Sequence, residues 1–114
     1  MISQEEYFDH WHVRRLMWEW RRVRPRVLVA EAQGDWGTLW EVFNEMKPYI
    51  RAAFRLLEDE MEMSVLYLGA WAFLMGDASA RLGRKEEECL WVALGELIAG
   101  FHERNILPLH GEVI

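Results

Sequence analysis

The chain has 114 residues, 52% of them hydrophobic and seven of them tryptophan, and its formal net charge is −6. This length builds one domain, and the apolar content excludes a disordered chain. The negative charge argues against non-specific nucleic-acid binding by the whole surface. So much apolar bulk is hard to bury in one small globule, which favours an oligomer or a partner-binding surface.

A single cysteine, Cys89, allows no intrachain disulfide and fits a reducing compartment. The first six residues are acidic and lack the apolar segment of a signal peptide, so we expect a cytoplasmic protein. The chain has eleven arginines and two lysines. We attribute this excess of arginine to the base composition of the genome, and we expect a prokaryotic or phage origin.

The first expected helix spans residues 4–23. Ser3 followed by Glu6 is a capping-box pattern that marks its start. Pro25 is expected to end it, because the residue before a proline is pushed out of the helical region.

One side of this first helix is an aromatic strip flanked by arginines. The strip consists of Tyr7, Trp11 and Trp18, with Phe8 at its margin, and it is flanked by Arg14, Arg15, Arg21 and Arg22. The simplest interpretation is structural: the aromatic side chains pack on a neighbouring helix and the arginines pair with acidic groups such as Glu19, 58–62 or 86–88. A protein partner on this strip comes second.

A nucleic acid is the third possibility for the strip, because aromatic rings interleaved with guanidinium groups can hold single strands and phosphates. That interpretation would depend on six arginines, namely Arg14, Arg15, Arg21, Arg22, Arg24 and Arg26.

Residues 26–33 are compatible with a short helix that begins at Pro25 and stops at Gly34, or with a short strand. We favour the helix because the chain offers few other strands for pairing. Asp35 or Thr38 then caps the next helix.

Residues 38–61 carry the strongest amphipathic pattern of the chain. Its apolar face contains Leu39, Val42, Phe43, Met46, Tyr49, Ile50, Ala53, Phe54, Leu57 and Met61. Pro48 lies on the polar side, and the apolar stripe keeps its phase across it. We therefore predict one kinked helix instead of two.

Residues 65–75 are apolar on every side and too few to cross a membrane. A helix of this kind must be covered all round. We expect the rest of the chain, or a second copy, to cover it.

Gly76 and Asp77 suggest a break, followed by a helical turn over residues 78–82 that Gly83 closes. The alternative is that the preceding helix continues through Gly76.

The last helix is expected to begin near Arg84 or Lys85 and to end at Asn105. Gly95 and Ala99 leave a flat groove where another helix could approach. The remaining residues, 106–114, are a non-helical apolar tail that should dock on something, and we count Ile106, Leu107 and Leu109 among the partner-binding residues.

The sequence contains few candidates for a catalytic or metal-binding site. Glu6, His10, His102 and His110 are the candidates for a metal site. In the expected helix His10 and His12 point roughly 160° apart and cannot share an ion, so we predict no metal and no cofactor. The sequence contains no motif of a catalytic nucleophile or of a phosphate-binding loop, so we do not favour an enzyme.

These patterns predict an all-α protein, a compact bundle of four or five helices with a non-helical apolar C-terminal tail. For function they favour a non-enzymatic protein–protein interaction module, such as a small helical adaptor, inhibitor or assembly factor, that forms a homodimer and does not enter membranes. A nucleic-acid-binding module is the alternative, and a metal-dependent helical enzyme using His and Glu is the second alternative.

Overall fold

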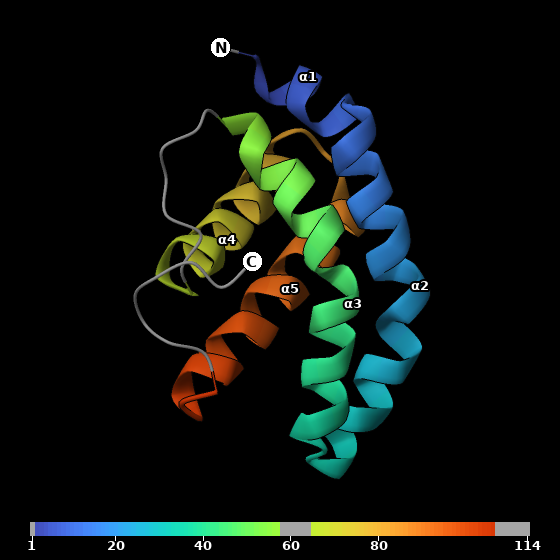
Figure 1. Cartoon of the computed structure of the whole chain (residues 1–114). Helices are drawn as coiled ribbons and strands as arrows, with labels where there is room; N and C mark the ends of the chain where they lie inside the picture. Colours follow the sequence, from blue (N-terminus) through green and yellow to red (C-terminus); the bar gives the residue numbers. More distant parts are fainter. Residues whose placement is uncertain (1, 58–64, 107–114) are drawn as a thin grey trace. The chain divides into compact units, whose positions relative to one another are not determined.

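The computed structural model describes residues 2–57 and 65–106 (Figure 1). Its elements are α1 (Gln4–Asp9), α2 (Trp11–Gln33), α3 (Trp36–Phe54), the short 3-10 helix η1 (Arg55–Leu57), α4 (Val65–Arg81) and α5 (Lys85–Glu103). Within these residues there are five α-helices and no strand, which confirms the predicted all-α class. Within them, too, no helix combines the length and the hydropathy that crossing a membrane requires.

The chain divides into two compact units. The first, Met1–Leu57, contains α1, α2, α3 and η1, and its main internal packing is that of α2 against α3. The second, Glu58–Ile114, contains α4 and α5, which pack against each other.

The first helix is broken at His10, where the sequence predicted one helix over residues 4–23. Ser3 caps α1, since its Oγ accepts a hydrogen bond from the Glu6 amide at 3.1 Å. His10 has extended backbone and caps α2, because its Nδ1 accepts the His12 amide at 3.1 Å. A ring nitrogen of histidine can accept a hydrogen bond, so His10 can act as the N-cap of a new helix. The sequence pattern had indicated an uninterrupted helix at this position.

The predicted stop at Pro25 is also wrong, since α2 continues through Pro25 to Gln33. The buried stripe of Val23, Val27 and Ala30 stays in phase across the proline, and burial of that stripe outweighs the lost backbone donor. The helical prediction for residues 26–33 is confirmed. Gly34 ends α2 in the left-handed conformation, with φ of 65°.

Asp35 is the N-cap of α3 and makes two hydrogen bonds with Thr38. Its carboxylate accepts the Thr38 amide at 3.1 Å and the Thr38 hydroxyl at 2.6 Å. These bonds favour the ionised carboxylate and lower the pKa of Asp35 below its ordinary value of 3.8. The sequence named Asp35 and Thr38 as the two cap candidates, and Asp35 is the one in use.

Helix α3 runs unbroken through Pro48, which confirms the prediction of one helix instead of two. The stripe is buried, at Leu39, Val42, Phe43, Met46, Ile50, Ala53 and Phe54. The regular α-helix ends at Phe54, and the last part of the predicted span, residues 58–61, lies outside the described residues.

Helices α4 and α5 form an antiparallel hairpin that is closed by Gly83, with φ of 75°. The predicted break at Gly76 and the separate turn at residues 78–82 are wrong, because α4 continues to Arg81. Gly76 serves the packing: a Cβ there would lie 3.0 Å from Val92 Cγ2. The glycine thus allows α5 to approach closely.

The C-terminal end of α5 lies close to its predicted position. The helix ends at Glu103, and Asn105 follows with φ of 55°, as is common for asparagine just after a helix. The predicted flat groove at Gly95 is filled within the unit, because a Cβ on Gly95 would lie 2.9 Å from the Phe73 ring.

Residues 65–75, which we expect the rest of the chain or a second copy to cover, are only partly buried among the described residues. Leu68, Trp71 and Ala72 are buried. Tyr67, Phe73 and Leu74 are 43%, 40% and 61% exposed, and we call these three residues the α4 exposed face. Within the second unit, α5 is the helix that packs against α4.

Candidate functional site

Helix α2 has two different faces. The inner face is buried and consists of Val13, Leu16, Met17, Glu19, Trp20, Val23, Val27 and Ala30. The outer face carries two large aromatic side chains, Trp11 and Trp18, which are 62% and 55% exposed. They are seven residues apart, so they share one side of the helix at a separation of roughly 10 Å along its axis.

The predicted aromatic strip is therefore divided. Trp11 and Trp18 belong to the surface, whereas Tyr7 is only 3% exposed and its hydroxyl donates to the Ala53 carbonyl at 2.9 Å. Phe8 is buried as well. The break at His10 separates α1 from the α2 axis, and this removes Tyr7 from the predicted partner-binding residues.

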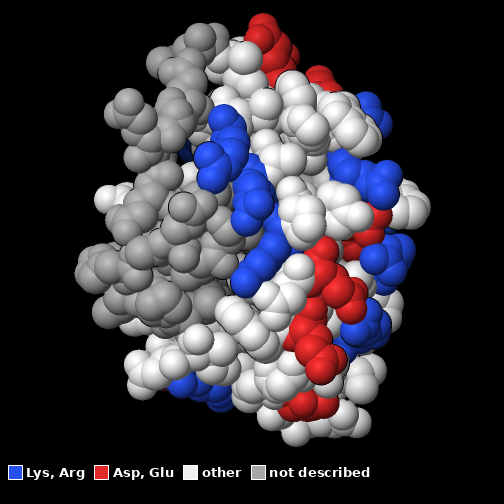
Figure 2. Space-filling model, viewed as in Figure 1, with Lys and Arg blue, Asp and Glu red and all other residues white. Residues whose placement is uncertain are grey.

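Arginines surround the two exposed indoles. We call Trp11, Arg14, Arg15, Trp18, Arg21 and Arg22 the α2 outer surface; each of these side chains is exposed. In Figure 2 basic and acidic groups lie next to one another at the right edge, where Figure 1 places α2. The surface is thus a mixture of apolar rings and charges.

Glu19 organises two of these arginines. It is only 4% exposed, and its two carboxylate oxygens accept from Arg15 Nη2 at 3.0 Å and Arg22 Nη2 at 2.9 Å. Arg22 Nε adds a bond of 3.0 Å. The structural interpretation of the arginines, in which Glu19 was one expected partner, is confirmed for these two.

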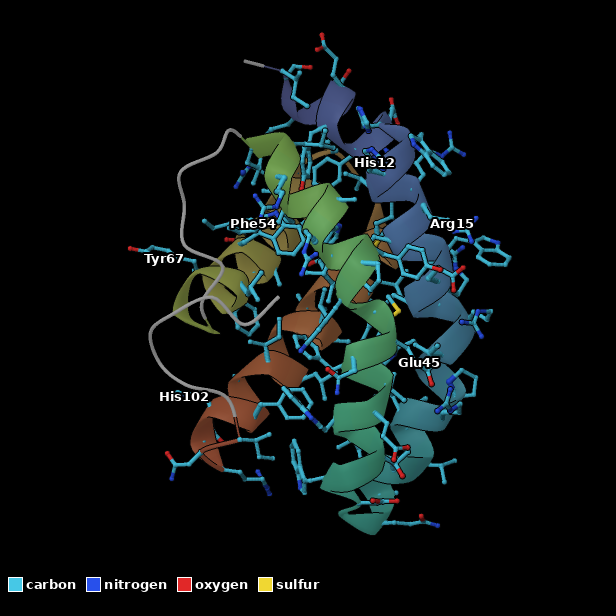
Figure 3. The ribbon with its side chains drawn as sticks, viewed as in Figure 1. His12, Arg15, Glu45, Phe54, Tyr67 and His102 are labelled. Atoms are coloured by element: carbon cyan, nitrogen blue, oxygen red, sulfur yellow. The ribbon has the colours of Figure 1, made fainter. Side chains whose placement is uncertain are left out.

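Arg15 also stacks on aromatic rings. Its guanidinium carbon lies 5.7 Å from the centre of the Trp18 ring and 5.4 Å from that of Tyr49 on α3. Figure 3 labels Arg15 on the α2 ribbon. The guanidinium is thus held in place by a carboxylate and two π-systems.

Other arginines of α2 are also engaged within the first unit. Arg26 pairs with Glu45 of α3 at 3.1 Å, and the guanidinium of Arg24 lies 5.4 Å from the Trp20 ring centre. The sequence did not indicate the Arg26–Glu45 pair, because the two residues are 19 apart and meet only when α2 and α3 pack.

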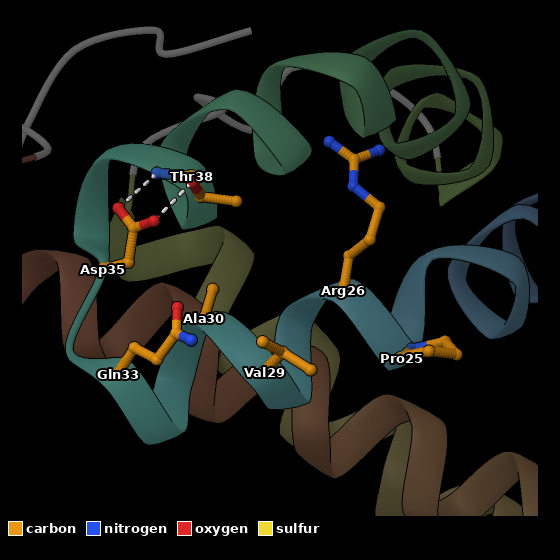
Figure 4. A pocket seen from close by; sticks show the side chains of 7 residues that line it. All are labelled: Pro25, Arg26, Val29, Ala30, Gln33, Asp35 and Thr38. Carbon is orange, nitrogen blue, oxygen red and sulfur yellow. Dashed lines mark hydrogen bonds between the residues drawn. The ribbon is translucent and has the colours of Figure 1, made fainter.

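A pocket of about 430 Å³ lies beside the C-terminal part of α2 (Figure 4). It is lined by Pro25, Arg26, Val29, Ala30, Gln33, Asp35 and Thr38. Two neighbouring apolar residues on the outside of α2, Leu28 and Val29, are more than half exposed. The sequence did not indicate this region, because the pattern of residues 26–33 does not tell which of their side chains are exposed.

A row of cations on α3 was also missed. Lys47 and Arg51 lie four residues apart on one side of α3, and Arg55, the first residue of η1, follows four residues later. Lys47 Nζ lies 5.0 Å from the centre of the Trp40 ring. The spacing is visible in the sequence, but we did not single out these residues there.

The imidazoles of His10 and His12 are not directed apart. Their rings stack with centroids 5.2 Å apart and an interplanar angle of 24°, so the predicted 160° separation is wrong. The cause is again the extended backbone at His10, which interrupts the helical phase.

The metal candidates do not gather into a site within the described residues. There, no group of three or more His, Cys, Asp or Glu side chains could hold an ion. Glu6 lies in the first turn of α1, His102 is in the last turn of α5, and His110 lies outside the described residues.

The predicted contact residues of the tail are described only at Ile106. Its amide donates to the Phe101 carbonyl at 2.8 Å, and its side chain is half-buried. Leu107 and Leu109 lie outside the described residues.

Fold and surface together define an all-α protein with exposed tryptophans set among ordered arginines. Comparison of the chain with protein-family models, with curated protein sequences and with solved structures finds no match.

Proposed function

We propose that this protein is a non-enzymatic protein–protein interaction module, a small helical adaptor, inhibitor or assembly factor, that makes contact through the α2 outer surface. One observation carries the proposal: Trp11 and Trp18, two turns apart on one side of α2, are each more than half exposed. Tryptophan is enriched at the energetic centres of protein interfaces. Because the opposite side of α2 already forms the core, these indoles are available for a partner.

The possible gain from covering these indoles is large. Each could lose roughly 100 Å² of exposed apolar area on contact, which corresponds to about 2–3 kcal/mol. Both rings belong to a regular helix, so little backbone entropy is lost on binding.

Self-association is part of the proposal, and the α4 exposed face supports it best. In a two-fold dimer the same patch meets its own copy. Tyr67, Phe73 and Leu74 carry no charge, and Tyr67 points outward from α4 in Figure 3. The α2 outer surface would bring arginines against arginines in the same arrangement. We therefore propose a homodimer that forms through α4 and leaves α2 open.

Nucleic-acid binding is less well supported than protein binding. Arg15 and Arg22 share the Glu19 carboxylate and Arg26 pairs with Glu45, so several arginines already have acidic partners. The net charge of −6 adds long-range repulsion of a polyanion. For a metal-dependent enzyme, the part of the chain that the structure describes contains no cluster of metal ligands that would support it.

Two variants test the proposal separately. The Trp11→Ala/Trp18→Ala double variant should keep its helicity by circular dichroism and its dimer mass by light scattering. It should lose binding partners that the wild-type protein captures from native cell extract. Leu74→Asp should turn the dimer into a monomer.

Unfolding of the Trp11→Ala/Trp18→Ala double variant would mean that the indoles are structural, and the proposed contact surface would be wrong. A wild-type protein that stays monomeric at high concentration would refute the dimer alone.

A further inference from the structure

The α2 outer surface has more positive than negative charge close to its indoles. Arg14, Arg15 and Arg22 are exposed, and Glu19 is the carboxylate that Arg15 and Arg22 share. Within the α2 outer surface, four arginines, the fourth being Arg21, thus stand against the Glu19 carboxylate. The surplus lies within a chain whose total charge is −6, so this surface differs in sign from the protein as a whole.

The surplus charge is held in fixed positions. Glu19 is almost fully buried and binds Arg22 through Nε and Nη2 and Arg15 through Nη2. A guanidinium has five N–H donors, so both arginines keep free donors for a second acceptor. Fixed donors lose little entropy when a carboxylate binds, and paired N–H groups match its geometry.

Charge and apolar surface alternate along the helix. Arg14 and Arg15 lie between Trp11 and Trp18 in the sequence, and the Arg15 guanidinium stacks over the Trp18 ring. A helical partner lying alongside presents its own residues i and i+7 at the same spacing of roughly 10 Å. Its residues at i+3 and i+4 then fall opposite Arg14 and Arg15.

Two other occupants fit this surface less well. A second copy of α2 would place arginines opposite arginines, which lowers affinity. A nucleic acid carries far more negative charge than one acidic helix, so a chain of net charge −6 repels it more strongly.

We infer that the α2 outer surface binds an acidic amphipathic helix of another protein. Apolar side chains of that helix cover Trp11 and Trp18, and its carboxylates bind Arg14, Arg15 and Arg22. The inference rests on the proposed function, because it names the kind of partner for the same surface.

Selection from a displayed peptide library tests this inference. The library holds 21-residue helical peptides with leucine at two heptad positions and random residues at the positions that flank them. Peptides are selected on the full-length wild-type protein and counter-selected on Trp11→Ala/Trp18→Ala. We expect the enriched peptides to carry glutamate or aspartate beside the leucines.

Charge reversal then locates the contact. For an enriched peptide, Arg14→Glu should raise Kd at least tenfold, and changing the facing glutamate of the peptide to lysine should restore binding to that variant. Arg51→Glu is the matched control, because it makes the same charge change on the cationic row of α3. It should change Kd less than twofold.

The outcomes separate the two proposals. Trp-dependent peptides with neutral or basic flanks, or insensitivity to Arg14→Glu, would overturn the acidic partner and leave the contact surface in place. A larger effect of Arg51→Glu than of Arg14→Glu would move the acidic site to α3. A single-stranded oligonucleotide that displaces the peptide equally well at physiological salt would favour nucleic acid instead. If no enriched peptide depends on Trp11 and Trp18, both proposals fail.

Discussion

The α2 outer surface and the α4 exposed face both contain solvent-exposed aromatic side chains, but the surroundings of these side chains differ. On α2 the indoles lie among arginines, and a buried glutamate and stacking fix one of those arginines in place. On α4 the exposed side chains are apolar and uncharged, and one of them, Phe73, packs against Gly95 of α5. We therefore propose that the charged surface selects its partner by charge, whereas the uncharged surface can meet its own copy.

The largest expected effect separates the two faces of α2. Trp20→Ala should lower the free energy of unfolding by about 3–5 kcal/mol, because Trp20 is fully buried and its loss leaves a cavity. Trp18→Ala, on the other side of the same helix, should change it by less than about 0.5 kcal/mol. Urea denaturation of both variants measures the difference. Similar losses for the two would erase the distinction between surface and core.

A smaller effect is expected at Glu19, which orders the α2 outer surface. Glu19→Gln should reduce the free energy of unfolding by about 1–2 kcal/mol, since charge-assisted bonds to two half-exposed arginines are weakened. Glu41→Gln, an exposed change on α3, is the matched control and should be neutral. Thermal denaturation compares them, and equal melting temperatures would show that Glu19 has no ordering role.

Substitutions at two glycines, one on α4 and one on α5, test how closely these two helices pack. Gly69→Ala should raise the free energy of unfolding by about 0.5–1 kcal/mol, because the new Cβ meets Ile98 at an ordinary 3.8 Å and alanine favours helix. Gly95→Ala should lack this gain, because the Phe73 ring must move. Adding Phe73→Leu should restore it, which a double-mutant cycle by calorimetry can measure. A plain gain for Gly95→Ala alone would mean that Phe73 is not held there.

The smallest expected effect is on the stability of the first unit at acidic pH. Hydrogen bonds from Thr38 lower the pKa of Asp35, so this group stabilises the fold above its unfolded pKa of 3.8 and loses that contribution as pH falls through its lower folded value. Asp35→Asn should therefore lower the melting temperature at pH 6 and differ less from wild type at pH 2.5. A constant difference between wild type and Asp35→Asn across this range would contradict the role of the cap.

Much of the secondary structure could be predicted because it follows local rules. The cap at Ser3, the cap at Asp35 and the stops at Gly34 and Gly83 depend on nearby residues, and each is present. The errors at Pro25 and Gly76 have one cause. Both residues weaken an isolated helix, but packing of α2 on α3 and of α4 on α5 outweighs that local penalty.

The candidate surface was predicted in part. The sequence named Trp11, Trp18 and their arginines, because a period of seven places them on one side of a helix. It included Tyr7 wrongly, since the pattern does not reveal that a histidine can cap a new helix. It also missed Leu28 and Val29, whose exposure depends on which side of α2 meets α3.

The sequence by itself determined the helical class, most helix ends and the excess of large apolar side chains, because periodicity and capping act between residues a few positions apart. Only the tertiary structure decided which tryptophans are core and which are surface. It also set the Arg26–Glu45 pair and the Arg15–Tyr49 stacking. Burial and long-range pairing depend on which helix faces meet, and that choice is made by the packing of the whole unit.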